Sequence, residues 1–343
     1  LKLLHGSAWM HVLKIMRPLL LAVLVLIAQL VWTKFSLSLV SPVAVTGATG
    51  KLGRLAVQQL VEQGCKVRCL VRHDPSQLPS AAQDASAADV AAWLASMPGV
   101  ELVRGDVTDR SKLMELLSDC SACLALHGAT RRTQLSDLLP WVDETLEPTH
   151  AKQVNRESVR YLIEAAQASK SCGRIVRVTG KGEEPWSIFS ILINGLGSMA
   201  KAWNYEGERL LRDCSDVEYT IVRPGVMGNV DAKLKDATLV LADNGGDLKV
   251  SSIPHRSVAQ LCVRCLEFPN AARATLCAMT VPGDEGAETF DPLLAKVSSD
   301  TRAFPGGELF EQHQLAVRVG GLLLSGFGLG LIWGVTSLFR VSS

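Results

Sequence analysis

Short apolar runs rich in β-branched residues alternate with stretches of helical periodicity along the middle of the chain. The apolar runs predict seven strands, over 42–46, 66–72, 100–105, 122–127, 174–179, 218–223 and 275–280. In the stretches between them, apolar residues recur at three- and four-residue spacing, which is typical of helices with one buried face. Such stretches predict helices over 51–63, 110–119, 154–169, 200–213 and 257–267. Because alternating strands and helices form parallel sheets covered on both sides, we predict an α/β fold with a doubly wound parallel sheet.

Two uncharged stretches flank this pattern. The first, residues 18–32, follows Lys14 and Arg17 and is shorter than the roughly 20 residues that a membrane helix needs. Its length and basic leading edge are typical of a signal-peptide core or a signal anchor, so we predict a targeting segment over residues 1–40. The second stretch, residues 319–339, has no charged residue and is long enough to span a bilayer, so it predicts a transmembrane helix.

Charge and cysteine content exclude two classes of function. The 35 Lys and Arg residues balance 34 Asp and Glu residues, so there is no basic excess to bind nucleic acid, and no nucleic-acid partner is expected. Nine cysteines include two C-x-x-C pairs, at Cys120 with Cys123 and at Cys262 with Cys265. Because these pairs lie far apart in the sequence, we predict free, partly buried thiols and no metal site.

The segment TGATGKLGR, residues 46–54, joins the first predicted strand to the first predicted helix. In this context, Gly47 allows a tight turn, Gly50 allows the backbone to approach a pyrophosphate, and Gly53 allows the helix to pack on the sheet. The helix then presents free N–H groups and the positive end of its dipole to the anion. The residues predicted to bind a dinucleotide cofactor here are Gly47, Thr49, Gly50, Lys51, Leu52 and Gly53.

The end of the second predicted strand selects the cofactor. An acidic residue at this place binds the ribose 2′-hydroxyl of NAD, but this strand ends in Arg72. Because a guanidinium suits a 2′-phosphate, we predict that NADP(H) is preferred, with NAD(H) as the alternative.

Residues 42–283 resemble the atypical, NmrA-like branch of the short-chain dehydrogenase/reductase family. The segments that carry the resemblance are VTGATGKLGR, RGDVTD, ALHGAT, VNRESVRYLIEAA and YTIVRPGVM. The resemblance implies a Rossmann fold and an NAD(P) cofactor. It places Asp106 and Val107 beside the adenine, and His127 and Gly128 under the ribose and nicotinamide.

Within that family, KAWNYEGERLLRD followed by YTIVRPG is similar to plastid and cyanobacterial members, including photosystem II assembly factors and Tic62-like proteins. This similarity implies a plastid location at the thylakoid membrane, with an endomembrane as the alternative. The expected partners are a membrane and either a hydrophobic small-molecule substrate or a membrane protein. We predict a targeting segment over 1–40, a Rossmann domain over 41–300, and a tail over 301–343 that contains the transmembrane helix.

Catalytic members of the family end the fifth strand with Ser or Thr and carry Tyr-x-x-x-Lys on the next helix, in which Tyr is the general acid/base. The resemblance assigns the position of the strand-end Ser or Thr to Thr179 and the position of the Lys to Lys201. Lys201 is also expected to hold the nicotinamide ribose. However, Gly197 occupies the position of the Tyr, and His127 and Tyr205 are the alternative proton donors. The chain is therefore expected to be either a reductase of a hydrophobic substrate or a non-catalytic NADP(H)-binding assembly or tethering factor.

Between these two catalytic candidates lies an apolar stretch, Trp186 to Leu196, expected over the nicotinamide end of the cleft. The sequence leaves its role open. It either lines a pocket for a hydrophobic substrate, docks on a membrane or partner, or packs as ordinary core or lid.

Overall fold

The computed structural model describes residues 41–321 of the chain, apart from 83, 139–142, 181–182, 229–236, 247, 284 and 306. The predicted targeting segment, residues 1–40, and residues 322–339 of the predicted transmembrane helix lie outside the described residues, so both stay predictions. Within the described part, no helix combines the length and the apolar character needed to cross a membrane.

The main sheet confirms the predicted fold class. In the described part of the chain it has eight strands in the order β3-β2-β1-β4-β5-β6-β10-β8, and every neighbouring pair is parallel except β10 with β8. Its strands are β1 (Val43–Thr46), β2 (Val67–Val71), β3 (Val100–Arg104), β4 (Ala122–Ala125), β5 (Arg174–Val178), β6 (Glu218–Pro224), β8 (Ala237–Ala242) and β10 (Ala274–Pro282). All seven predicted strands are therefore confirmed. A separate parallel pair, β7 (Val226–Gly228) with β9 (Ser252–Pro254), was not predicted, nor was β8.

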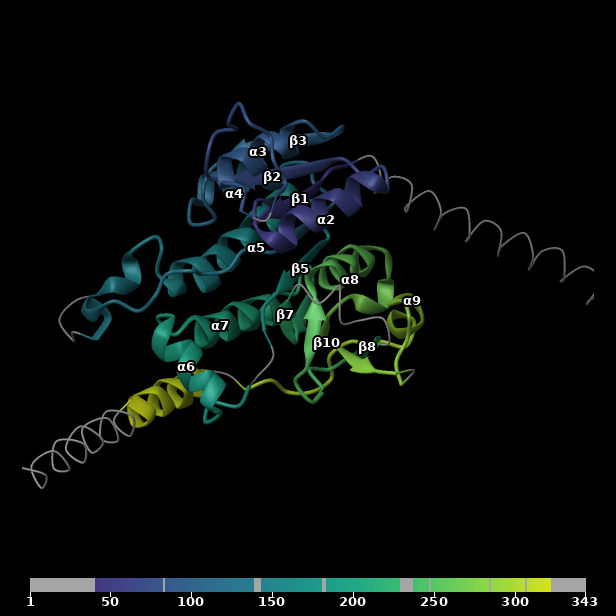
Figure 1. Ribbon diagram of the computed structural model, residues 1–343. Helices are drawn as coiled ribbons and strands as arrows, with labels where there is room; N and C mark the ends of the chain where they lie inside the picture. Colours follow the sequence, from purple (N-terminus) through teal and green to yellow (C-terminus); the bar gives the residue numbers. More distant parts are fainter. Residues whose placement is uncertain are drawn as a thin grey trace, which may run out of the picture. The chain divides into compact units, whose positions relative to one another are not determined.

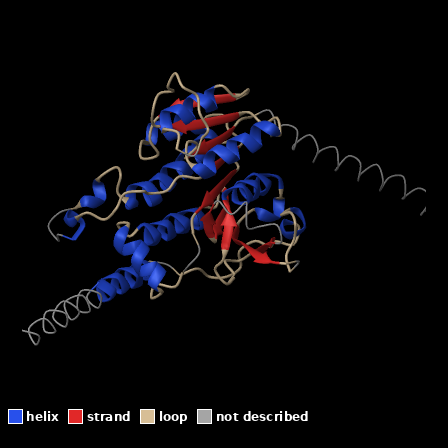
Figure 2. Cartoon of the chain, viewed as in Figure 1, coloured by secondary structure: helices blue, strands red, loops and turns tan. Residues whose placement is uncertain are grey.

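Helices cover both faces of this sheet (Figures 1 and 2). One face packs against α2 (Lys51–Glu62), α3 (Ala87–Ala95) and α8 (His255–Glu267). The other packs against α4 (Arg110–Leu117), α5 (Ser158–Ser169) and α7 (Ala200–Asp213). The remaining helical segments are η1 (Leu135–Leu138), η2 (Glu144–Leu146), η3 (Gln153–Glu157), α6 (Ile188–Leu196), η4 (Pro269–Ala271), α9 (Asp291–Leu294) and residues 308–321.

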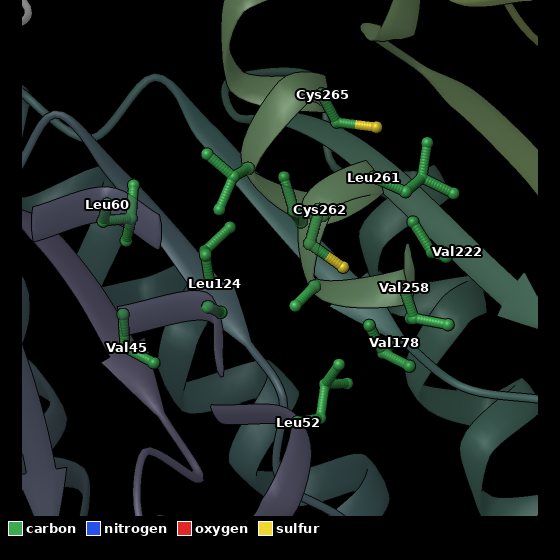
Figure 3. Packing of buried hydrophobic residues seen from close by; sticks show 14 of the residues in the cluster. Val45, Leu52, Leu60, Leu124, Val178, Val222, Val258, Leu261, Cys262 and Cys265 are labelled. Atoms are coloured by element: carbon green, nitrogen blue, oxygen red, sulfur yellow. The ribbon is translucent and has the colours of Figure 1, made fainter. Parts of the chain in front are cut away.

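Alternation along the strands divides the core between the two faces. In β1, Val43 and Val45 belong to the cluster under α2 and α8, whereas Ala44 belongs to the cluster under α4 and α5. Figure 3 shows the first cluster, in which side chains of four neighbouring strands meet side chains of α2 and α8. Its labelled members are Val45, Leu52, Leu60, Leu124, Val178, Val222, Val258, Leu261, Cys262 and Cys265. The second C-x-x-C pair is thus part of the apolar core, and the nine cysteines are free thiols.

The strand order positions a binding crevice. β1 lies between β2 and β4, so the chain winds outwards in opposite directions from β1, and a crevice forms where the carboxyl ends of β1 and β4 diverge. Gly47 begins the turn at this point with φ 71°, a conformation that favours glycine.

The start of α2 packs directly on that turn. A Cβ atom at Gly53 would lie 2.1 Å from the carbonyl oxygen of Gly47, which forces the helix away from the turn. We expect Gly53→Ala to lower the free energy of unfolding by about 1–3 kcal/mol, measured by urea denaturation. The matched control is Gly173→Ala, where a Cβ would meet no atom within 4 Å and the change is expected to stay within about 0.5 kcal/mol. Equal stability of the two variants would contradict this account of the turn.

Candidate active site

A cavity of about 250 Å³ opens at the carboxyl ends of β1, β4 and β5. The glycine turn and the start of α2 form one wall, and the residues after β4 and β5 form another. Its lining residues are Gly47, Gly50, Lys51, Leu52, Gly53, Leu126, His127, Gly128, Val178, Thr179, Asn204, Met227 and His255. Seven of the predicted cofactor-binding residues therefore line one cavity, together with the predicted catalytic residue Thr179.

The glycine wall has the features of an anion site. Gly50 is the N-cap of α2, with an extended backbone and no side chain to cap the helix, and the first turn carries no acidic residue. The first amide N–H groups and the dipole of α2 thus remain available for a phosphate. A Cβ atom at Gly47 would lie 2.8 Å from the backbone nitrogen of His127, so only glycine keeps the turn this close to the end of β4. These residues fit a dinucleotide pyrophosphate.

A second cavity, of about 240 Å³, adjoins the first. The two share Gly128, Thr179 and Asn204, so they meet at the end of β5. The other residues that line the second cavity are Ala129, Asn155, Gly180, Ile193, Ala200, Lys201, Tyr205 and Glu208. Most of the polar groups in this cavity come from α7.

Helix α6 positions the amino end of α7. The Oδ1 atom of Asn194 accepts hydrogen bonds from the backbone N–H groups of Lys201, at 3.0 Å, and Ala202, at 3.1 Å, which caps the helix. The Nζ atom of Lys201 donates to the Oγ atom of Ser190, also on α6. Burial lowers the pKa of Lys201 to about 8, because an apolar environment disfavours the ammonium form.

The expectation that Gly197 marks the position of a missing phenol is wrong. Gly197 is the C-cap of α6, and α7 begins only at Ala200, so Gly197 is not on the helix of Lys201. Tyr205 instead lies four residues after Lys201 in α7, and residues at this spacing share a helix face. The spacing of the family motif is thus present in reverse, as Lys-x-x-x-Tyr.

Tyr205 carries an unused hydrogen-bond donor. Its side chain is buried, and its hydroxyl finds no hydrogen-bond partner among the described residues. Its ring stacks on the His313 ring, with centroids 6.0 Å apart, and the Arg223 guanidinium lies 4.9 Å from the Tyr205 ring centroid. Burial raises the pKa of Tyr205 well above 10, so the phenol keeps its proton at neutral pH. A buried, unpaired donor that lines a cavity is a group that a ligand can satisfy.

Thr179, the other predicted catalytic residue, is held by a buried carboxylate. Its Oγ1 atom donates to Oε1 of Glu208 at 2.5 Å. The same carboxylate accepts hydrogen bonds from Arg223, at 3.2 Å to Nε, and from Arg212, at 3.0 Å to Nη2. Burial alone would raise the pKa of Glu208, but the charges of these two guanidinium groups outweigh it and lower that pKa below 4.5. Glu208 is therefore ionised at neutral pH and fixes the hydroxyl of Thr179.

Both ring nitrogens of His127, an alternative proton donor, are engaged in hydrogen bonds within the protein. The hydroxyl of Ser158 donates to the carbonyl of Val154 at 2.5 Å, so its oxygen accepts the Nε2–H group of His127 at 2.9 Å. The Nδ1 atom then accepts the hydroxyl proton of Thr46 at 2.6 Å. Burial lowers the pKa of His127 well below 6.5, which leaves a neutral ring that braces the end of β4.

Two polar residues that were not predicted from the sequence hold the walls of the cavities by hydrogen bonds. Arg177 of β5 is buried and donates to the carbonyl of His127, at 2.7 Å, and to Oδ1 of Asn204, at 3.1 Å. Asn155 joins the two walls of the second cavity, since it accepts the N–H of Ala129 at 3.0 Å and donates to the carbonyl of Ala200 at 2.9 Å. The only sequence signal for Arg177 was a charge inside a predicted strand.

Four other predicted cofactor-binding residues lie outside both cavities: Arg72, predicted for the 2′-phosphate, Asp106 and Val107, predicted for the adenine, and Thr49 of the glycine turn. Arg72 is exposed at the end of β2. Asp106 follows β3 and accepts hydrogen bonds from the backbone and hydroxyl of Thr108, and Val107 is buried. Thr49 sits in the glycine turn, half-buried. The structure therefore does not bring these four residues into either cavity.

Comparison with known proteins supports this interpretation of the first cavity. A family model described as NAD(P)H-binding matches residues 47–269. Chloroplastic Tic62 of Pisum sativum is 22% identical over 276 residues, which are 80% of this chain and 49% of that protein. The Arabidopsis thaliana Tic62 protein is 23% identical over 262 residues, which are 75% of this chain and 38% of that protein. The chain thus spans about half the length of these relatives or less.

Solved structures show the same fold at low identity. A short-chain dehydrogenase/reductase from Veillonella parvula, solved in complex with NADP, has a TM-score of 0.51 at 12% identity, over 72% of this chain and 96% of that one. An oxidoreductase from Lactococcus lactis has a TM-score of 0.52 at 13% identity, over 74% of this chain and 95% of that one.

The neutral state of His127 predicts a pH dependence of stability. Its folded pKa lies well below 6.5, so unfolding takes up a proton below pH about 6.5. The free energy of unfolding should therefore fall as the pH falls, by up to about 1.4 kcal/mol per pH unit for this residue. Chemical denaturation between about pH 7 and 5 should show a shallower fall for His127→Asn than for the unmutated chain. The control, exposed His73→Asn, should leave the slope unchanged, and an unchanged slope in His127→Asn would contradict the buried neutral ring.

Proposed function

Because the chain belongs to the family of NAD(P)H-binding Rossmann proteins, we propose that it is an NADPH-dependent reductase of a hydrophobic carbonyl compound. One observation carries this proposal: an uncapped glycine cradle and a buried, unpaired phenol line two adjoining cavities. The cradle suits the pyrophosphate of a dinucleotide, and the phenol suits the oxygen of a carbonyl.

Residues of both cavities would hold the cofactor. In the first cavity, the amino end of α2 would bind the pyrophosphate, and Gly128 leaves room beside the end of β4. Lys201, which lines the second cavity, would donate to the nicotinamide ribose. When bound, NADPH supplies the hydride. Arg177 keeps Asn204 between the two cavities, which orients an amide toward the place where cofactor and substrate meet.

The second cavity supplies the proton. Hydride addition to a carbonyl carbon leaves an alkoxide, and the phenol of Tyr205 donates its proton to that oxygen. The high pKa of Tyr205 does not prevent this transfer, because an alkoxide is a much stronger base than a phenolate. Lys201, with a pKa of about 8, is still largely protonated near neutral pH and offsets the charge of the phenolate from the same helix face. Solvent then returns the proton to Tyr205.

The proposal places the protein at a plastid membrane. Residues 319–339 contain no charged residue, and a bilayer-spanning helix needs such a stretch of about 20 residues. The Tic62 relatives carry chloroplastic in their names, which supports a plastid compartment, and we take the thylakoid as the membrane. A tether of this kind favours substrates that partition into lipid.

Tyr205→Phe tests the catalytic role. The variant keeps the ring that stacks on His313 but loses the acid, so the turnover number should fall by about 10²- to 10⁴-fold. The affinity for NADPH should stay unchanged. Consumption of NADPH with a panel of apolar aldehydes and ketones measures the rate, and Tyr161→Phe on α5 is the matched control. Tight NADPH binding without turnover of any carbonyl by the unmutated protein would favour the non-catalytic assembly or tethering factor.

Arg72→Ala tests the choice of cofactor. We propose that Arg72 binds the 2′-phosphate, since it is exposed at the end of β2. Titration of the unmutated protein should show tighter binding of NADPH than of NADH. The variant should lose most of this difference, about 1–3 kcal/mol for a charged hydrogen bond. Lys66→Ala, at the opposite end of the same strand, should keep it. Equal affinities for the two cofactors in the unmutated protein would reject the assignment.

A further inference from the structure

Helix α6 has its polar side chains inside and its apolar side chains outside. Ser190 and Asn194 are its buried residues, whereas Ile188 and Phe189 are 75% and 73% exposed. A surface helix of a globular protein shows the opposite arrangement. The exposed apolar residues of this region are Trp186, Ile188, Phe189, Leu192, Ile193 and Leu196, and we call them the α6 patch.

The inner contacts prevent α6 from turning its apolar side inwards. Asn194 caps α7 and also bonds to Nδ1 of His313 at 3.1 Å. The hydroxyl of Ser190 accepts a hydrogen bond from the ammonium of Lys201 and donates one to the carbonyl of Glu184 at 2.5 Å. Rotation of α6 would break all these bonds in a buried environment, where each unpaired group costs about 1–3 kcal/mol. The patch is therefore a fixed feature of the surface.

Exposure of this patch to water is unfavourable. Burial of a side chain of the size of Ile, Leu or Phe contributes about 1.5–3 kcal/mol, and the segment Ile188–Leu196 contains no charged residue. Contiguous apolar surface of this kind marks a place where a protein meets a membrane or another protein.

The neighbouring helix indicates which of these partners it meets. Helical residues 308–321 pack closely on α6, since a Cβ atom at Gly320 would lie 2.7 Å from the side chain of Ile191. Figure 1 shows this helix, in yellow, beside α6. From there the sequence continues without a charge to residue 339. If that stretch enters a bilayer, α6 is held at the bilayer surface.

We propose that the α6 patch docks into the interface of a lipid bilayer, with the helix axis along the membrane surface. This inference rests on the membrane tether proposed above, which is the reason for choosing a lipid bilayer as the partner. An interfacial helix buries its apolar face about 5–10 Å into the boundary between headgroups and acyl chains. Because Ile193 of the patch also lines the second cavity, docking brings that cavity to the lipid and lets an apolar substrate enter from the bilayer.

A spin label at Leu192→Cys in the full chain tests the docking. The partly exposed thiols Cys65 and Cys214 are replaced by serine, and the matched control is a label at Gln58→Cys, exposed on α2. In phosphatidylcholine vesicles, the label at 192 should lose most of its accessibility to a water-soluble nickel chelate and gain accessibility to oxygen. The label at 58 should remain accessible to the chelate.

Two outcomes would overturn the proposal. In the first, the label at 192 stays accessible to the chelate in the presence of vesicles. In the second, the label is already shielded from both probes without vesicles, because its own chain or a second copy covers the patch. A carbonate wash of the same vesicles reports on the tether separately. If the protein stays with the vesicles after the wash while the label at 192 is exposed to water, docking is rejected and the tether is supported. If the wash releases a protein whose label was immersed in the bilayer, docking is supported and the tether is rejected.

Discussion

The buried carboxylate of Glu208 fixes α7 against the sheet, and the groups proposed to act in the second cavity depend on it. Glu208 accepts bonds from Thr179 at the end of β5 and from Arg223 of β6, so one side chain joins a helix to two strands. Loss of one partner from a buried ion pair costs about 3–5 kcal/mol, because the remaining charge is left unpaired. The same helix carries Lys201 and Tyr205, whose positions over the end of β5 follow from this attachment.

A second set of polar contacts connects the site to the surface of the protein. Asn194 of α6 caps α7 and bonds to His313, and the ring of His313 stacks on Tyr205. The inner face of α6 is polar because Asn194 hydrogen-bonds the amino end of α7 and Ser190 hydrogen-bonds the side chain of Lys201. Its apolar residues are consequently left outside. The inverted helix and the placement of Lys201 and Tyr205 thus have one physical origin, which is why the surface proposed to meet a membrane shares Ile193 with the second cavity.

The sequence predicted the parts of the fold that local pattern determines. Short apolar runs rich in β-branched residues identified β1 to β6 and β10, and the glycine spacing identified the turn before α2. β8 was missed although its residues, Ala237–Ala242, also form a short apolar run. Helix α6 was not predicted, and the sequence left the role of its apolar residues open between a substrate pocket, a docking surface and ordinary packing.

The residues of the candidate site also divide into those that the sequence could identify and those that it could not. The glycine turn could be predicted from the sequence because backbone geometry requires glycine at Gly47, with its positive φ, and at Gly53, where a Cβ would meet the Gly47 carbonyl. Arg177 and Arg223 could not, since a charge inside a strand is normally turned to solvent and only tertiary contacts with α7 explain their burial. Tyr205 appeared in the sequence only as an alternative donor. Its selection over His127 required knowledge of which buried donors and acceptors are already paired, and that depends on contacts between residues distant in the chain.

The central claim is that one dinucleotide extends from the glycine turn to the end of β5 and presents its nicotinamide to Tyr205. A crystal structure of the protein with NADP⁺ tests this most directly. We expect the pyrophosphate at the amino end of α2 and the nicotinamide ring beside Thr179, with its C4 atom open to the second cavity. A pyrophosphate bound elsewhere, or a nicotinamide whose C4 atom faces away from the cavity that contains Tyr205, would contradict the account.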